Sequence, residues 1–255
     1  MVEDEWTMTE SQLVLEYLYA AVVLVVAYAV RGTTGFGGQA MAVPLMALIL
    51  PLQVVVPVIT VLTALSSFTY WKRDRGKIAW GEIFRLLPFT LLGVLLGLYV
   101  FQQADPATLT KSFGVFIILY ALFSLRPARA ANRPLRHARL IGSVLSTTSG
   151  VLGAIFGAAA GPMYVIYFNL LNYEKDVFRA TVTTILMFQA CARMAGYIKL
   201  GLYDRNALLL IAMGLPLMLI GAWIGGFLGN RVNQQVFNRC VAAMLALSGV
   251  ALLLK

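Results

Sequence analysis

The chain has 255 residues, of which 60% are hydrophobic and only 12% charged, and its mean hydropathy is +0.81. These values lie far from those of soluble domains and indicate a membrane protein. The formal net charge is +9, but half of the cations fall in two short loops between apolar segments, which the positive-inside rule explains better than nucleic-acid binding does. Continuous apolar runs favour helices over a barrel, whose strands would alternate apolar and polar residues. The expected fold class is therefore an all-α polytopic membrane protein.

Ten apolar segments are expected in chain order, at residues 12–30, 35–51, 53–71, 82–103, 107–125, 138–156, 157–171, 178–198, 206–229 and 234–254. Segments 35–51 and 157–171 are short for a hydrocarbon core of ~30 Å, which takes about 20 helical residues. They are expected to be either short spanning helices or re-entrant half-helices.

The two cationic loops set the expected orientation. They lie at residues 72–85 and 126–139, and placing both in the cytoplasm puts the N- and C-termini outside, in a multi-pass protein of the inner membrane. The first residues, MVEDEW, lack the cationic region of a secretory signal, so the N-terminus is expected to be retained.

The two halves of the chain resemble each other. Residues 35–44 (GFGGQAMAVP) align with residues 157–166 (GAAAGPMYVI) at an offset of 122. A proline and two glycines recur at an offset of 128, with Pro88, Gly93 and Gly97 matching Pro216, Gly221 and Gly225. An odd number of crossings per half inverts the second copy, so we predict an inverted repeat with halves 1–125 and 140–255 and a basic cytoplasmic linker at 126–139. The repeated glycines are expected to allow close helix packing.

Two glycine-rich interruptions, RGTTGFGG at 31–38 and STTSGVLGAIFGAAAGP at 146–162, break the apolar pattern. Unpaired backbone groups cost several kcal/mol in lipid, so such breaks persist only where they are buried in protein or line a cavity. Each break precedes a short helix, whose N-terminal N–H groups and partial positive charge favour anions. The alternative is that the glycines only permit tight packing or turns. The polar candidates at the breaks are Thr33, Thr34, Gln39, Ser146, Thr147, Thr148 and Ser149.

The segment TVTTILMFQACARMAGYIKL, residues 181–200, carries Gln189 and Arg193 four residues apart and therefore on one helix face. A cation inside a spanning helix costs at least ~2.5 kcal/mol and is a candidate for substrate binding. The alternative is that Arg193 extends to the membrane surface. Lys72 is its expected counterpart in the first half. Further candidate hydroxyl donors in segment 53–71 are Thr63, Ser66 and Ser67.

All eleven acidic residues lie in the termini, loops or segment edges. The sequence therefore predicts no proton carrier at the middle of the membrane, and it contains no recognisable catalytic carboxylate pair, nucleophile elbow or metal cluster. We expect the protein not to be an enzyme and to need no cofactor or metal.

The paired motifs GTTGFGGQAMAVPLMALI and SGVLGAIFGAAAGPMYVIYF, each followed by an apolar helix and then by the proline and glycine helix, carry a resemblance over nearly the whole chain. They resemble the sulfite exporter TauE/SafE family of bacterial and archaeal membrane permeases. The resemblance implies transport of small sulfur-containing or carboxylate anions, such as sulfite, sulfoacetate and other organosulfonates. By position, it places the family's glycine-rich motif on Gly35, Gly37, Gly38, Gly157 and Gly161. The second copy reads GAAAGP and offers fewer unhindered backbone donors.

These observations predict a secondary transporter that exports a small oxyanion, either an organosulfonate or sulfite, by alternating access of the two repeats. An inside-negative potential drives a monovalent anion outward by ~2.3 kcal/mol per 100 mV, so export needs no coupled ion. The expected partners are the small anion and the lipid bilayer, without nucleic acid, and an oligomer is compatible with the sequence. The alternatives are an anion channel, an importer of a small sulfonate or carboxylate, and a membrane scaffold that transports nothing.

Overall fold

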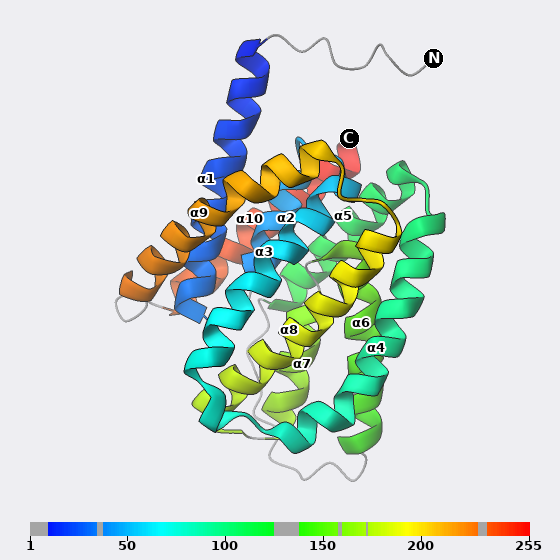
Figure 1. Ribbon diagram of the computed structural model, residues 1–255, viewed down its shortest axis with the longest axis vertical. Coiled ribbons are helices and arrows are strands. Elements are labelled where there is room, and N and C mark those ends of the chain that lie inside the picture. Colours follow the sequence, from blue (N-terminus) through cyan, green and yellow to red (C-terminus); the bar gives the residue numbers. More distant parts are fainter. Residues whose placement is uncertain (1–9, 35–37, 125–137, 158–159, 172, 229–233) are drawn as a thin grey trace.

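The computed structural model describes residues 10–34, 38–124, 138–157, 160–171, 173–228 and 234–255 (Figure 1). These residues form helices without any strand, which confirms the all-α fold class. The elements are α1 (Glu10–Thr34), α2 (Gly38–Ala47), α3 (Leu52–Arg73), the 3₁₀ turn η1 (Arg75–Lys77), α4 (Trp80–Gln103), α5 (Pro106–Ser124), α6 (Ala138–Phe156), α7 (Ala160–Leu170), α8 (Lys175–Lys199), α9 (Arg205–Leu228) and α10 (Gln234–Leu254).

Five of the described helices contain a stretch long and apolar enough to cross a membrane: Leu15–Thr33, Leu52–Thr69, Trp80–Gln103, Arg139–Phe156 and Arg205–Phe227. Two shorter apolar stretches, Pro106–Leu122 and Ala242–Leu254, accompany them. Large apolar side chains such as Trp223 and Leu95 remain 76% and 66% exposed on the outer face, where lipid would surround them. The protein is therefore a polytopic helical membrane protein.

The two short helices fold back on the helices that precede them. Tyr19, early in α1, donates a hydrogen bond to the carbonyl oxygen of Leu45, late in α2, at 3.0 Å. Gly142, early in α6, lies against the ring of Tyr167, late in α7. α1 and α2 are thus antiparallel, as are α6 and α7. With 10 and 11 residues, α2 and α7 are only about 15 Å long, half the thickness of the hydrocarbon core. A length of half the core favours the re-entrant form, and the choice between the two expected forms stays a prediction.

The helices of the two halves are interleaved. α1 packs against α9, and α4 packs against α6, so each of these pairs joins the first half to the second (Figure 1). α3 pairs with α8 and α5 with α10. If each helix is replaced by its equivalent in the other half, α1 by α6, α4 by α9 and so on, the same four pairs result. This is the contact pattern expected of the repeat. The exact division at 1–125, 126–139 and 140–255 stays a prediction, and most of the linker lies outside the described residues.

The repeated glycines lie at the two interleaved contacts. A Cβ atom on Gly93 of α4 would stand 2.1 Å from the carbonyl oxygen of Thr147 in α6, and one on Gly225 of α9 would stand 2.0 Å from that of Ala29 in α1. The backbones therefore touch, which only glycine permits. Gly97 and Gly221 lie in the same two contacts. The packing role predicted for these glycines is confirmed.

One end of the molecule contains η1, with its cations Arg75 and Lys77, and the other contains both ends of the described chain (Figure 1). η1 and the first turns of α4, α6 and α8 share the cationic end. There Lys77 forms an exposed ion pair with Asp176, and this hydrogen bond raises the pKa of the Lys77 ammonium above its ordinary value. The start of α1 and Lys255 lie at the opposite end. The position of both ends of the described chain on one side agrees with the expected parity of crossings, and the identity of that side stays a prediction.

Candidate functional site

Both glycine breaks lie where an antiparallel helix pair reverses. A Cβ atom on Gly38, the first residue of α2, would meet the Cβ of Arg31 at 2.9 Å and the carbonyl oxygen of Ala27 at 3.0 Å. Gly157 follows α6 with a φ of +68°, a left-handed conformation that strains other L-residues. A Cβ on Gly157 would approach Val43 of α2 at 3.4 Å, so the second break packs against the short helix of the first.

Arg193 of α8 joins the two breaks and is completely buried. Its Nη1 donates hydrogen bonds to the carbonyl oxygens of Gly153 and Gly157, the latter at 3.5 Å, at the C-terminal end of α6. Its Nη2 donates to Oε1 of Gln39, in the first turn of α2, at 3.4 Å. The cation thus caps carbonyls that carry the negative end of the α6 dipole. Arg193 does not extend to the membrane surface, so that alternative was wrong.

The hydrogen-bond partners of Arg193 are all neutral. Among the described residues, no carboxylate pairs with it. The buried polar residues of the described chain include no aspartate or glutamate. A buried cation held only by amide and carbonyl oxygens keeps a net positive charge, and that charge favours an anion nearby.

Arg31, at the end of α1, is a second completely buried arginine, and sequence reasoning did not select it as a site residue. Its Nη2 donates a hydrogen bond to Oγ of Ser67 in α3 at 2.5 Å, and Gly38 packs against its side chain. Consecutive residues of α2 therefore contact the two arginines, Gly38 touching Arg31 and Gln39 touching Arg193. The sequence feature that could have identified Arg31 is its place as a cation at the first position of the glycine-rich interruption RGTTGFGG.

The two arginines occupy related places in the repeat. At the interleaved contacts, the carbonyl oxygen of Ala29 faces Gly225 and the carbonyl oxygen of Val151 faces Gly97. Ala29 and Val151 are 122 residues apart, which is the offset found between the two glycine-rich motifs. That offset places Arg31 opposite Gly153. The pair Arg31 and Ser67 therefore corresponds to the pair Gly153 and Arg193, with the arginine on the other helix. By this contact Ser67 takes the place that corresponds to Arg193. The expected counterpart, Lys72, is exposed, with its Nζ 4.8 Å from the centre of the Phe68 ring, and the assignment of a counterpart stays a prediction.

Gln189 lies one turn before Arg193 on α8 and is also completely buried. Its Nε2 donates a hydrogen bond to the carbonyl oxygen of Ser149 in α6 at 2.8 Å. Its Oε1 and the Nε of Arg193 are buried without a hydrogen-bond partner among the described residues. The expected shared face of these two side chains points at the end of α6 and the start of α2.

The hydroxyl candidates are distributed over several contacts. The hydroxyl groups of Thr33 and Thr147 donate to carbonyls of their own helices, at 2.7 Å to Val30 and 3.0 Å to Ser143. The hydroxyls of Ser146 and Ser149 bond to the Tyr164 hydroxyl of α7. Of the remaining predicted residues, Thr148 is half-buried and Gly161 is buried in the first turn of α7. Gly35, Gly37 and the side chain of Thr34 lie outside the described residues.

Two cavities of about 360 and 480 Å³ lie at the end of the molecule opposite the cationic loops. Both are bordered by Gln53 of α3, and lysines line each of them, Lys111 and Lys255 in one and Lys199 in the other. Neither includes a residue of the glycine breaks. The candidate site is therefore defined by its buried polar contacts, and these cavities are separate from it.

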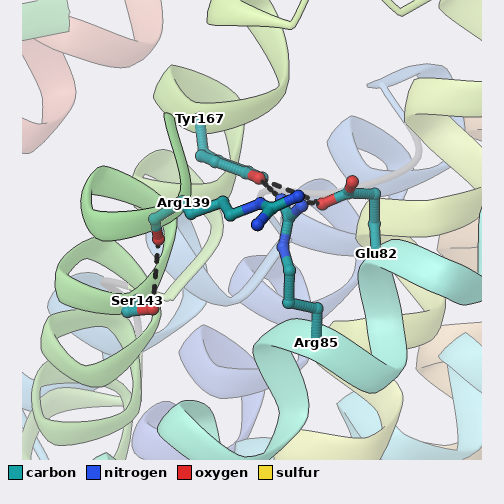
Figure 2. A network of polar contacts seen from close by, with 5 residues as sticks. All are labelled: Glu82, Arg85, Arg139, Ser143 and Tyr167. Atoms are coloured by element: carbon teal, nitrogen blue, oxygen red, sulfur yellow. Dashed lines mark hydrogen bonds and ion pairs between the residues drawn. The ribbon is translucent and has the colours of Figure 1, made fainter. Parts of the chain in front are cut away.

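A further polar network lies at the cationic end, between α4 and α7 (Figure 2). Arg85 forms an ion pair with Glu82 and donates a hydrogen bond to the hydroxyl of Tyr167, which donates to Oε2 of Glu82 at 3.0 Å. The side chain of Arg139, from α6, extends toward the same group (Figure 2). The network ties the first half to the short helix of the second.

Replacing Tyr167 with phenylalanine removes this link while keeping the ring. We expect a loss of about 1 kcal/mol in the free energy of unfolding, because one buried hydrogen-bonding hydroxyl is removed. Thermal unfolding of the detergent-solubilised protein measures it. Tyr120→Phe is the matched control, since the Tyr120 ring stacks on Phe116 and its hydroxyl has no hydrogen bond to the described residues. Equal losses in the two variants would contradict a contribution from the network.

Two opposed helix pairs, interrupted by glycine and joined through a buried arginine, are the construction of secondary membrane transporters with inverted repeats. The family model for the sulfite exporter TauE/SafE family matches residues 19–252. The chain therefore belongs to this family of membrane transporters, and the resemblance found in the sequence is confirmed. It is also similar to a probable inner membrane transporter protein, TsaS, of Comamonas testosteroni, with 29% identity over 181 residues that cover 69% of this chain and 73% of that protein. No solved structure matches the chain significantly.

Proposed function

We propose that the protein exports small oxyanions, either organosulfonates or sulfite, across the inner membrane by alternating access of its two repeats. The observation that carries the proposal is Arg193, a completely buried cation with neutral partners from both glycine breaks. Burying such a charge is costly, and a bound anion offsets that cost. The start of α2 adds backbone N–H donors and a positive dipole end beside it.

The proposed site involves Arg193, Gln39 and Gln189, with Arg31 next to it. The guanidinium presents a planar donor edge that matches two oxygens of a sulfonate, sulfite or carboxylate group. Its bond to Gln39 is long, at 3.4 Å, so an oxyanion can replace it without large loss. The hydroxyl groups that bond within their own helices or to Tyr164 already have partners, which leaves the anion to the arginine and the amides.

The interleaved contacts restrict the movement that alternating access needs. α1 packs against α9 and α4 against α6 through touching backbones. A motion that separated residues 1–125 from residues 140–255 would break both contacts. We therefore propose that the moving bodies are mixed, one containing α1, α2 and α9 and the other α4, α6 and α7, and that the site lies between them.

Proteoliposomes that contain the purified protein test the proposal. We expect saturable flux of sulfite or sulfoacetate that accelerates when the compartment holding the anion is made electrically negative, because the potential acts on the charge that moves. Flux that ignores the imposed potential would contradict uncoupled export. Stimulation by a proton gradient would indicate coupled transport, and ohmic currents without saturation would indicate a channel.

A further inference from the structure

We infer that the substrate of the proposed site carries a hydroxyl group in addition to its anionic group. The inference rests on the proposed anion site and specifies the chemical class of its ligand. It arises from two buried atoms of opposite hydrogen-bonding character on one face of α8. The Nε of Arg193 is a donor and the Oε1 of Gln189 is an acceptor, and neither has a partner among the described residues.

The orientation of the Gln189 amide follows from its neighbour. The carbonyl oxygen of Ser149, 2.8 Å away, can only accept a hydrogen bond, so the atom of Gln189 that faces it has to be the Nε2 donor. The Oε1 acceptor consequently faces the other way. A flipped amide would set two acceptors against each other, which is unfavourable in a buried place. The Oε1 of Gln189 is therefore a hydrogen-bond acceptor available to the site, and the bond to Ser149 fixes its orientation.

The spacing of the two residues on α8 suits a short ligand. Residues four apart on a helix have Cβ atoms about 5–6 Å apart on the same face. A sulfonate separated from a hydroxyl by two carbon atoms can place its oxygens at the Arg193 guanidinium and its O–H at the Gln189 oxygen. A protonated amine could also donate to that oxygen, but its positive charge would lie close to the buried guanidinium. The geometry thus favours a hydroxyl as the donor.

Two ligands of equal size test the inference on the purified, full-length protein. In 2-hydroxyethanesulfonate, a hydroxyl stands where propanesulfonate has a methyl group. We expect the hydroxylated ligand to bind at least about tenfold more tightly, because propanesulfonate leaves the Gln189 oxygen buried and unsatisfied. Calorimetric titration, or half-saturation of the flux in proteoliposomes, measures the ratio.

The variant Gln189→Leu removes the acceptor with little change in size. We expect it to reduce the preference to about twofold or less, mainly through weaker binding of the hydroxylated ligand. Gln102→Leu, at an exposed position of α4, is the matched control and should keep the wild-type preference.

The outcomes separate the two proposals. Equal binding of the two ligands by the wild-type protein overturns the inference and leaves the anion site standing, and this comparison does not depend on whether the variant folds. A preference that persists in Gln189→Leu overturns the assignment to Gln189. Failure to bind or transport either sulfonate, sulfite or sulfoacetate overturns the proposed function, and this inference with it.

Discussion

Exchange of Arg193 for glutamine is expected to lower anion flux at least about 100-fold. The variant loses the only charge among the described residues of the proposed site that contacts both glycine breaks. Two charge-assisted hydrogen bonds to a bound oxyanion contribute about 3 kcal/mol together, which corresponds to roughly two orders of magnitude in affinity. The variant Arg193→Lys should recover little of the lost flux, because an ammonium group cannot present the planar pair of donors that a guanidinium has. Flux in proteoliposomes at matched protein density measures both variants.

The matched control for this prediction is Lys72→Gln. It removes the same charge from an exposed side chain that lies over the Phe68 ring, away from the breaks. Flux should stay within about twofold of wild type. Thermal unfolding of all variants separates loss of binding from loss of fold. Near-normal transport by a folded Arg193→Gln protein would remove Arg193 from the site.

The second large effect concerns stability and uses two adjacent glycines of α9. We expect Gly225→Ala to lower the free energy of unfolding by about 1–3 kcal/mol or more, because its Cβ atom would stand 2.0 Å from the backbone oxygen of Ala29. Backbone atoms cannot move aside as a flexible side chain can, so α1 and α9 have to separate. Thermal unfolding in detergent measures the change.

Gly226→Ala is the control for that variant. A Cβ atom there would meet no other atom within 4 Å. Alanine is the better helix former, so this variant should be unchanged or more stable by about 0.5–1 kcal/mol. Similar destabilisation of the two variants would show that helix packing at Gly225 does not limit stability. The same comparison extends to the equivalent contact of α4 with α6.

The interleaved packing also explains why the buried polar residues cluster where they do. α8 lies next to both α3 and α4, and its middle faces the C-terminal half of α6 and the start of α2. The side chains of Gln189 and Arg193 would be costly in lipid but are completely buried in protein. The helix is consequently supported by its neighbours and does not depend on its own hydropathy to stay in the membrane.

The sequence by itself determined the all-α class, the positions of the ten α-helices of the described residues, two of them short, and the packing role of the repeated glycines. Length and apolar composition decide these features, because each helix satisfies its own backbone in lipid regardless of its neighbours. The family followed from local motifs. The importance of Gln189 and Arg193 was also visible, since polar residues within an apolar run are costly wherever they lie.

Only the tertiary structure decided which side chains meet. The sequence could not show that α2 and α7 turn back, that Arg31 is as deeply buried as Arg193, or that Arg31 contacts Ser67. It also could not separate Thr33 and Thr147, which bond to their own helices, from Gln39, which reaches Arg193. The physical reason is that these outcomes depend on contacts between residues of different helices at least 25 positions apart in the sequence, which form through the packing of whole faces and leave no local periodicity.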